Sequence, residues 1–265
     1  MGNRTKIEWC DASWNPVTGC LHGCEYCYAR RISERFSAGH SPAVFLSNAE
    51  LEEPVISRRG RKEPYPYGFE PTFHRYRLSE PKHWMKEKTI FVCSMADLFG
   101  DWVPDEWIKD VFKACWEAPQ HTYLFLTKNP KRYAKLHGEG ALPLWINMWY
   151  GASATNNKQL EDAAEAFDNT PVVALKFLSI EPIQEDISAG IETMHLLKVP
   201  DWIIIGAETG NRKDKTVPRK EWIENICRVA DRFRKAVFMK DSLIPIVGEE
   251  NMRREFPWDL PGWNE

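Results

Sequence analysis

The chain has 265 residues, of which 43% are hydrophobic, so it can bury the full core of a domain of α/β-barrel size or of two smaller domains. Its formal net charge of −3 does not by itself indicate a polyanionic partner. No apolar run approaches the roughly 20 residues that a membrane helix needs, and the first residues lack the apolar core of a signal peptide. We therefore expect a cytoplasmic protein that does not contact a membrane.

A first strand is predicted near Ser13–Thr18, and it leads directly into a loop with three cysteines. Cys20, Cys24 and Cys27 have the spacing C-x3-C-x2-C, and a helix is predicted at residues 28–38. Three thiolates at this spacing can hold three irons of a [4Fe-4S] cluster and leave the fourth iron open. An open iron can bind a substrate or a cofactor.

Other readings of the three cysteines remain open. A zinc site could include His22 as a ligand, although zinc sites usually contain two separated cysteine pairs and no second C-x2-C pair exists here. A redox or structural thiol cluster is a further alternative. Disulfides fit poorly, because the chain has seven cysteines, an odd number. Cys10 is close enough to the loop to be tested as a fourth ligand.

Residues 39–88 form a proline-rich insertion in which long helices and strands are not expected, although Thr72–Leu78 is compatible with a short strand. The basic run Arg58–Lys62 is followed by Tyr65, Tyr67 and Phe69. Basic and aromatic residues in this order can follow a nucleic-acid backbone and stack on bases. The alternative is an ordinary solvated loop.

The rest of the chain alternates short apolar runs with amphipathic segments. Strands are predicted at Thr89–Ser94, His121–Thr127, Trp145–Ser153, Val172–Ile180, Trp202–Gly206 and Ala236–Lys240. One helix is predicted to begin at Pro104, and another is predicted to end near Phe167. Two more are predicted at residues 130–137 and 218–234. This alternation predicts an α/β fold with βα units around a parallel sheet, in one domain that spans residues 1–265.

Polar residues follow these strands, and the carboxyl ends of parallel strands in an α/β barrel share the face that carries the active site. These residues are Ser94, Asp97, Thr127, Lys128, Ser153, Thr155, Asn156, Glu181, Glu208, Lys240 and Asp241. We therefore expect several loops to point at one pocket. For any single position, a helix cap or a surface loop is the alternative.

The run from Asn15 to Arg30, with Tyr26 just before the last cysteine, resembles the radical S-adenosylmethionine (radical SAM) enzymes. It is most similar to a phage-associated radical-SAM-like family of unknown function, and more distantly to the branch of spore photoproduct lyase and the DNA repair photolyases. The resemblance implies a partial or complete TIM-like (β/α) barrel. It also implies a single [4Fe-4S] cluster on Cys20, Cys24 and Cys27, whose open iron binds S-adenosyl-L-methionine.

The resemblance implies a reaction as well. A reducing donor of the flavodoxin or ferredoxin type would supply an electron, and S-adenosylmethionine would be cleaved to methionine and a 5′-deoxyadenosyl radical. That radical would abstract a hydrogen atom from the substrate in a lyase or modification reaction. A nucleic acid or nucleotide is the favoured substrate, and a peptide or small metabolite remains open. The alternative function is a non-enzymatic iron–sulfur or zinc protein that binds nucleic acid.

Cofactor-binding roles follow from the same resemblance. The chain has Ser94-Met95-Ala96-Asp97 where the family often has Gly-Gly-Glu, so Asp97 is the candidate partner of the methionyl amine and Ser94 lies beside it. Lys128 is the candidate for the methionyl carboxylate.

The remaining cofactor-binding candidates come from the later loops. Ser153, Thr155 and Asn156 would contact the ribose or the carboxylate, and Glu181 and Glu208 complete the predicted cofactor site.

Cys93 is a candidate hydrogen-atom donor to a product radical. Its alternative is a buried structural cysteine, because free cysteine is a common core residue.

Overall fold

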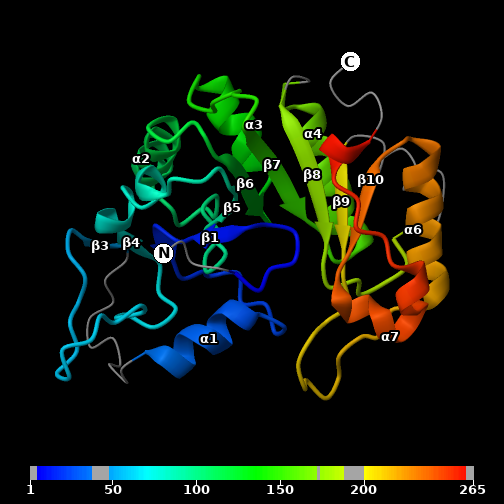
Figure 1. Ribbon diagram of the computed structural model, residues 1–265, viewed down its shortest axis with the longest axis horizontal. Helices are drawn as coiled ribbons and strands as arrows, with labels where there is room; N and C mark the ends of the chain where they lie inside the picture. The colour runs from blue at the N-terminus through cyan, green and yellow to red at the C-terminus, as the bar shows by residue number, and fades with distance from the viewer. Residues whose placement is uncertain (1–4, 38–47, 172–173, 188–199, 261–265) are drawn as a thin grey trace. The chain divides into compact units, whose positions relative to one another are not determined.

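The computed structural model describes residues 5–37, 48–171, 174–187 and 200–260. The chain forms two compact units, Met1–Arg132 and Tyr133–Glu265, which we call the first and second units (Figure 1). The first part of the predicted insertion, residues 39–47, lies outside the described residues. The expectation of one domain over the whole chain stays a prediction.

The first unit contains a parallel sheet in the order β1-β5-β6. The strands are β1 (Ala12–Trp14), β5 (Thr89–Val92) and β6 (Thr122–Thr127). Strand β5 is a short run of apolar residues with three buried positions, because strands of a parallel sheet are covered on both faces. Helix α2 (Asp105–Trp116) connects β5 to β6 and buries an apolar face.

A small second sheet in the first unit has the order β2-β4-β3. Its strands are β2 (Val17–Thr18), β4 (Thr72–His74) and β3 (Ala49–Leu51). Helix α1 (Tyr28–Phe36) confirms the predicted helix, and it lies on the opposite side of β1 from α2 in Figure 1. Short 3₁₀ turns follow β4 at Arg75–Arg77 and Pro81–His83.

Two sequence predictions need correction in this region. The strand predicted near Ser13–Thr18 is two strands, β1 and β2, which belong to different sheets. Pro16 separates them, and proline cannot donate a ladder hydrogen bond. The predicted strand Thr72–Leu78 ends at His74, where the chain turns into a 3₁₀ helix.

The second unit contains four parallel strands in the order β7-β8-β9-β10. They are β7 (Met148–Ser153), β8 (Leu175–Ile180), β9 (Trp202–Ile205) and β10 (Ala236–Met239). The other α-helices among the described residues are α3 (Lys131–Gly138), α4 (Asn157–Asp168), α6 (Lys220–Arg232) and α7 (Ile244–Val247). Further 3₁₀ turns lie at Asp241–Leu243, Glu249–Asn251 and Pro257–Asp259.

The predicted alternation of strands and helices is confirmed along both units, so the chain has an α/β fold. Observed and predicted ends differ by a few residues, because end residues depend on caps that periodicity does not reveal. The start of the predicted strand 172–180 falls partly outside the described residues. Among the described residues, no helix combines the length and the apolar character needed to cross a membrane.

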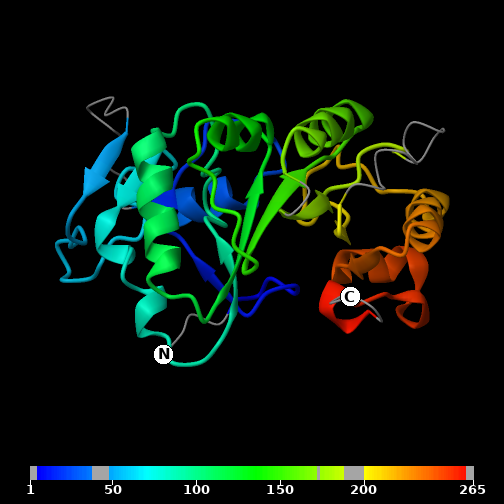
Figure 2. The same ribbon diagram turned by 90° about the horizontal axis from the view of Figure 1, so that it is seen from above.

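Aromatic packing around Trp202 forms much of the core of the second unit. Trp202 has no exposed surface, and its indole nitrogen donates a 3.0 Å hydrogen bond to the Glu255 carbonyl. Its ring centroid lies 5.4 Å from that of Phe256 and 6.0 Å from that of Trp258. The C-terminal turn Pro257–Asp259 therefore closes this core. Figure 2 shows this turn in red beside the orange elements of the unit.

Replacement of Trp202 by alanine is expected to lower the free energy of unfolding by about 3–5 kcal/mol, because a fully buried ring is lost and a cavity remains. Trp116→Ala is the matched control, since this side chain is 60% exposed. The control should cost less than about 1 kcal/mol. Urea unfolding followed by circular dichroism measures both values, and equal losses would contradict the assignment of the core.

Candidate functional site

The cysteine loop of the first unit begins at a backbone clamp. The Gly19 amide donates to the Met95 carbonyl at 2.9 Å, and the Cys20 amide donates to the Phe69 carbonyl at 3.2 Å. Gly19 has φ +88°, and a Cβ there would lie 2.2 Å from the Glu70 carbonyl oxygen. Only glycine fits this position, so the loop leaves β2 in a fixed direction between the β5 turn and the segment 65–70.

The three thiols of the loop lie within electrostatic reach of one another. Burial raises the pKa of Cys20 to about 12, and the charges of Asp97, Cys24 and Cys27 act in the same direction. Cys27 is the N-cap of α1, where its sulfur accepts the Arg30 amide at 3.3 Å. A thiolate at a helix N-terminus is stabilised by such a donor. This donor set suits a cation that attracts thiolates.

An apolar wall covers one side of the loop. Ala29, Phe69 and Met95 form a buried cluster, and Cys20, Cys27 and Tyr65 pack against it. Such a shell limits water near a metal centre. The described part of the chain contains no group of three or more histidine, cysteine or acidic side chains already arranged as a metal site. The three cysteines therefore remain predicted ligands.

Asp97 connects the cysteine loop to the ends of β5 and β6. His22 Nε2 donates to its Oδ2 at 2.7 Å, and the Lys128 amide donates to the same oxygen at 2.9 Å. Thr127 Oγ1 and the Phe99 amide donate to Oδ1 at 2.7 and 3.0 Å. A carboxylate has about four acceptor sites, so the predicted contact with a methionyl amine would have to displace one of these donors.

Three residues near the loop make contacts that were not predicted from the sequence. Asn15 Oδ1 accepts the Met95 amide at 2.9 Å and the Ser94 hydroxyl at 3.2 Å, so Asn15 holds the turn after β5. The Tyr28 hydroxyl donates to the Ser94 carbonyl at 2.7 Å. Arg30 donates to the Cys20 carbonyl at 3.4 Å, with its guanidinium 4.9 Å from the Phe69 ring centre. The only sequence signal was their position inside the motif run.

Cys93 lies directly after β5 with φ +58°, an uncommon conformation for a residue other than glycine. It is 2% exposed, and burial raises the pKa of its thiol to about 12. The thiol therefore keeps its proton at neutral pH. This burial is what the structural alternative requires, and the hydrogen-donor role stays a prediction.

Lys128 lies beside the cysteine loop, and its predicted contact with a methionyl carboxylate stays untested. Its ammonium nitrogen is 5.4 Å from the ring centre of Tyr26, the aromatic residue before the last cysteine. A cation at this distance is attracted by the ring face. Lys128 thus belongs to the same group of residues as His22 and Asp97.

In the second unit, two candidate acids lie just after strands and are paired with basic side chains. The expectation that several loops point at one pocket stays a prediction. Glu181 after β8 forms an ion pair with Lys240 after β10, and a Cβ at Gly206 would lie 3.2 to 3.3 Å from these two side chains. Glu208 after β9 forms a two-bond ion pair with Arg212, at 2.7 and 2.8 Å. Both acids are therefore charge-compensated, and their cofactor contacts stay predictions.

The other second-unit candidates lie between β7 and α4. Ser153 is the last residue of β7. Asn156 is the N-cap of α4, where its Oδ1 accepts the Gln159 amide at 2.9 Å. The Thr155 amide and hydroxyl donate to Gln159 Oε1 at 2.8 and 3.1 Å. Capping thus accounts for Asn156 and Thr155 in part, and the predicted ribose or carboxylate contacts stay untested.

Gly19→Ala is expected to destabilise the protein by roughly 3 kcal/mol or more, because the new Cβ meets backbone atoms and the residue keeps a positive φ. Gly23→Ala is the matched control, with φ +69° but nothing within 4 Å of a Cβ. It should cost roughly 1–2 kcal/mol. Thermal and urea unfolding of the two variants measure the difference, and equal costs would show that the clamp does not exist.

Asp97→Asn is expected to cost about 2–4 kcal/mol, because an amide group cannot accept from four donors and turns its own N–H groups toward some of them. Asp101→Asn removes the charge of an exposed acid whose Oδ1 accepts a 2.8 Å hydrogen bond from the Asn129 side-chain amide. This control should change stability by less than about 1 kcal/mol. A small effect of Asp97→Asn in urea unfolding would contradict its connecting role.

Comparison with solved structures finds spore photoproduct lyase. A cysteine-to-alanine mutant with dinucleoside spore photoproduct has a TM-score of 0.56 at 10% identity, over 90% of this chain and 78% of that chain. A complex of the lyase with the same dinucleoside has a TM-score of 0.54 at 11% identity and the same coverage. A double mutant with bound AdoMet and the dinucleoside has a TM-score of 0.56 at 10% identity, again with the same coverage.

These likenesses show the fold, a partial TIM-like α/β barrel, and confirm that part of the prediction. The phage association stays a prediction. No curated protein sequence matches the chain. A family model described as a protein of unknown function (DUF5131) matches residues 4–243, so the chain belongs to that family.

Proposed function

We propose that the chain is a radical SAM enzyme that acts on a nucleic acid or nucleotide. The observation that carries the proposal is the loop of Cys20, Cys24 and Cys27, clamped at strand ends in a fold shared with spore photoproduct lyase. When bound, a [4Fe-4S] cluster and S-adenosylmethionine would supply one-electron cleavage of that cofactor and hydrogen abstraction from the substrate. The protein has to hold these groups and exclude water.

The cysteine loop fits the cluster in three respects. It supplies three thiols and no more, it packs them against apolar residues, and an amide N–H already points at the Cys27 sulfur. Hydrogen bonds to sulfur and low water access both tune the potential of such a centre. The electron itself must come from a separate donor of the flavodoxin or ferredoxin type.

Residues of the first unit would hold the methionyl part of the cofactor. Lys128 places a cation near Tyr26 and the cysteine loop, where a carboxylate can pair with it. Asp97 fixes the Lys128 backbone and His22 at the same time. In this proposal Asp97 acts mainly by positioning, and a direct contact with the amine requires one of its donors to yield.

The substrate class rests on two lines of support. Solved structures of spore photoproduct lyase contain a dinucleoside. The insertion of this chain carries a basic run, and its aromatic residues Tyr65 and Phe69 pack beside the cysteine loop. The cofactor of one of those structures, AdoMet, supports the cofactor proposed here.

Anaerobic reconstitution with iron and sulfide, followed by dithionite reduction, tests the proposal. We expect about four irons per chain, a paramagnetic signal that shifts when S-adenosylmethionine is added, and formation of 5′-deoxyadenosine. Cys24→Ala should lose the iron, the signal and the product. Cys227→Ala is the matched control, because this cysteine lies in α6 of the second unit, and it should behave like the unsubstituted chain.

Cys10→Ala in the same assay decides whether a fourth thiol binds the cluster. The proposal expects iron content and the cofactor response to stay unchanged. A cluster whose paramagnetic signal does not change with S-adenosylmethionine, or zinc bound in place of iron, would contradict the proposed enzymatic function. Either result would favour a metal-containing protein that binds nucleic acid.

A further inference from the structure

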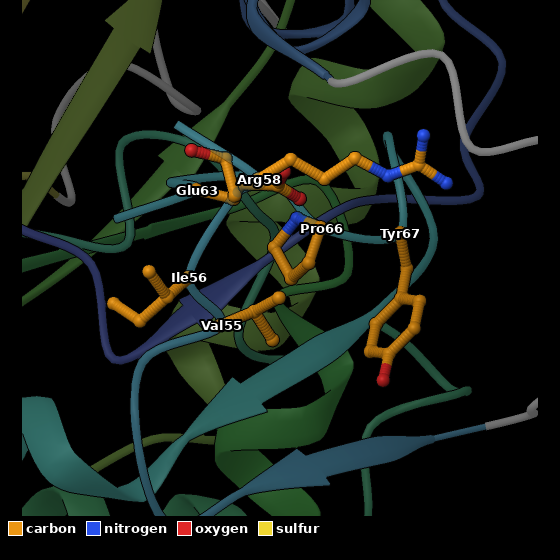
Figure 3. A pocket seen from close by; sticks show the side chains of 7 residues that line it. Val55, Ile56, Arg58, Glu63, Pro66 and Tyr67 are labelled. Carbon is orange, nitrogen blue, oxygen red and sulfur yellow. The ribbon is translucent and has the colours of Figure 1, made fainter. Parts of the chain in front are cut away.

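A pocket of about 180 Å³ lies in the insertion of the first unit. It combines apolar, aromatic and charged side chains, which Figure 3 shows around Pro66. Its lining residues are Val55, Ile56, Ser57, Arg58, Glu63, Pro66 and Tyr67. The pocket is therefore neither a purely apolar groove nor a purely charged patch.

The basic run is ordered as the tip of a small hairpin beside this pocket. The Gly60 amide donates to the Ser57 carbonyl at 2.9 Å, and the Glu63 amide donates to the Val55 carbonyl at 2.8 Å. Gly60 has φ +71°, which closes the turn. The turn leaves Arg58 exposed, and Figure 3 shows its side chain extending past Pro66 to the Tyr67 side of the pocket.

Glu63 is the unusual member of the lining. The residue is only 8% exposed, and its side-chain oxygens accept no hydrogen bond and form no ion pair with other described residues. Its carboxylate oxygens are not among the buried unpaired polar atoms of the described residues, so they reach solvent at the pocket. They are therefore available to accept from a ligand that supplies N–H donors.

The pocket is joined to the cysteine loop through the backbone. Pro66 and Tyr67 line the pocket, while Tyr65 just before them packs on the apolar cluster that holds Cys20 and Cys27. Two residues further on, the Phe69 carbonyl accepts the Cys20 amide. A ligand in this pocket would thus contact the segment that also forms a wall of the cysteine loop.

We propose that this pocket binds a guanine base of the substrate. Guanine presents two adjacent N–H donors, N1–H and the exocyclic amino group, which match the two oxygens of the Glu63 carboxylate. The Tyr67 ring offers a stacking surface, and Arg58 can pair with the attached phosphate. Uracil and thymine place a carbonyl on each side of their single N–H, and both carbonyls would face the carboxylate unfavourably.

The inference takes its class of ligand from the proposed function, but its test does not need the radical reaction. Isothermal titration calorimetry of the full chain with guanosine, inosine and uridine 5′-monophosphates should give affinities in that order, because inosine lacks the amino group and uridine offers one N–H flanked by two carbonyls. Glu63→Gln should weaken guanosine monophosphate binding by about tenfold or more, since one accepting oxygen becomes a donor. Glu53→Gln, an exposed acid of the same segment outside the lining, is the matched control and should leave the affinity unchanged.

Two further variants separate the roles of the lining. Tyr67→Phe should keep the affinity and Tyr67→Ala should reduce it, as expected for stacking. Arg58→Ala should weaken the binding of all three nucleotides and leave the order of their affinities unchanged. Circular dichroism verifies that each variant is folded.

Equal affinities for the three nucleotides, or normal guanosine monophosphate binding by Glu63→Gln, would overturn the inference. Binding lost only in Arg58→Ala would show a phosphate site without base recognition and would overturn it too. Base-selective binding in a chain that forms no 5′-deoxyadenosine would support the pocket and refute the radical reaction. Formation of 5′-deoxyadenosine without base-selective nucleotide binding would refute the pocket and leave the radical reaction standing.

Discussion

The carboxylate of Asp97 is the interaction on which the candidate site depends. It accepts hydrogen bonds from His22 in the cysteine loop, from Thr127 and the Lys128 amide at the end of β6, and from Phe99 in its own turn. Because Asp97 is only 5% exposed and both oxygens of its carboxylate are paired, water competes weakly for these donors. One side chain therefore sets the distance between the cysteine loop and the cation proposed to bind the cofactor.

The parts of the site that were predictable from sequence are local. The C-x3-C-x2-C spacing, the helix after it and the apolar runs of β5 to β10 are each encoded within a few consecutive residues. Contacts between distant segments were not predictable in the same way. Asn15 accepts a hydrogen bond from the Met95 amide, and the Cys20 amide donates one to the Phe69 carbonyl. No sequence periodicity links those positions. Asp97 was identified as an acid in the correct turn, but its four donors depend on three separate loops.

Burial was also hard to foresee. The basic and aromatic insertion was recognised from composition, whereas the low exposure of Glu63 and the hairpin that contains Arg58 were not. The hairpin depends on backbone hydrogen bonds among residues 55–63. In the second unit, the two predicted acids form ion pairs, Glu181 with Lys240 and Glu208 with Arg212. Partly buried acids at strand ends carry a desolvation cost unless a cation lies nearby, so these pairs are explained by stability before any ligand is considered.

The cap of helix α1 links the fold of the first unit to its proposed cofactor. Cys27 supplies the sulfur that accepts the Arg30 amide in the first turn of the helix, and the same sulfur is a proposed cluster ligand. A metal-bound thiolate carries negative charge at the positive end of the helix dipole, where a neutral thiol is a weaker acceptor. Loading with iron and ordering of α1 should accordingly reinforce each other. If the proposed cluster is present, its oxidative loss would weaken the cap of α1 as well as the proposed activity, and oxygen damage would change the conformation of the protein.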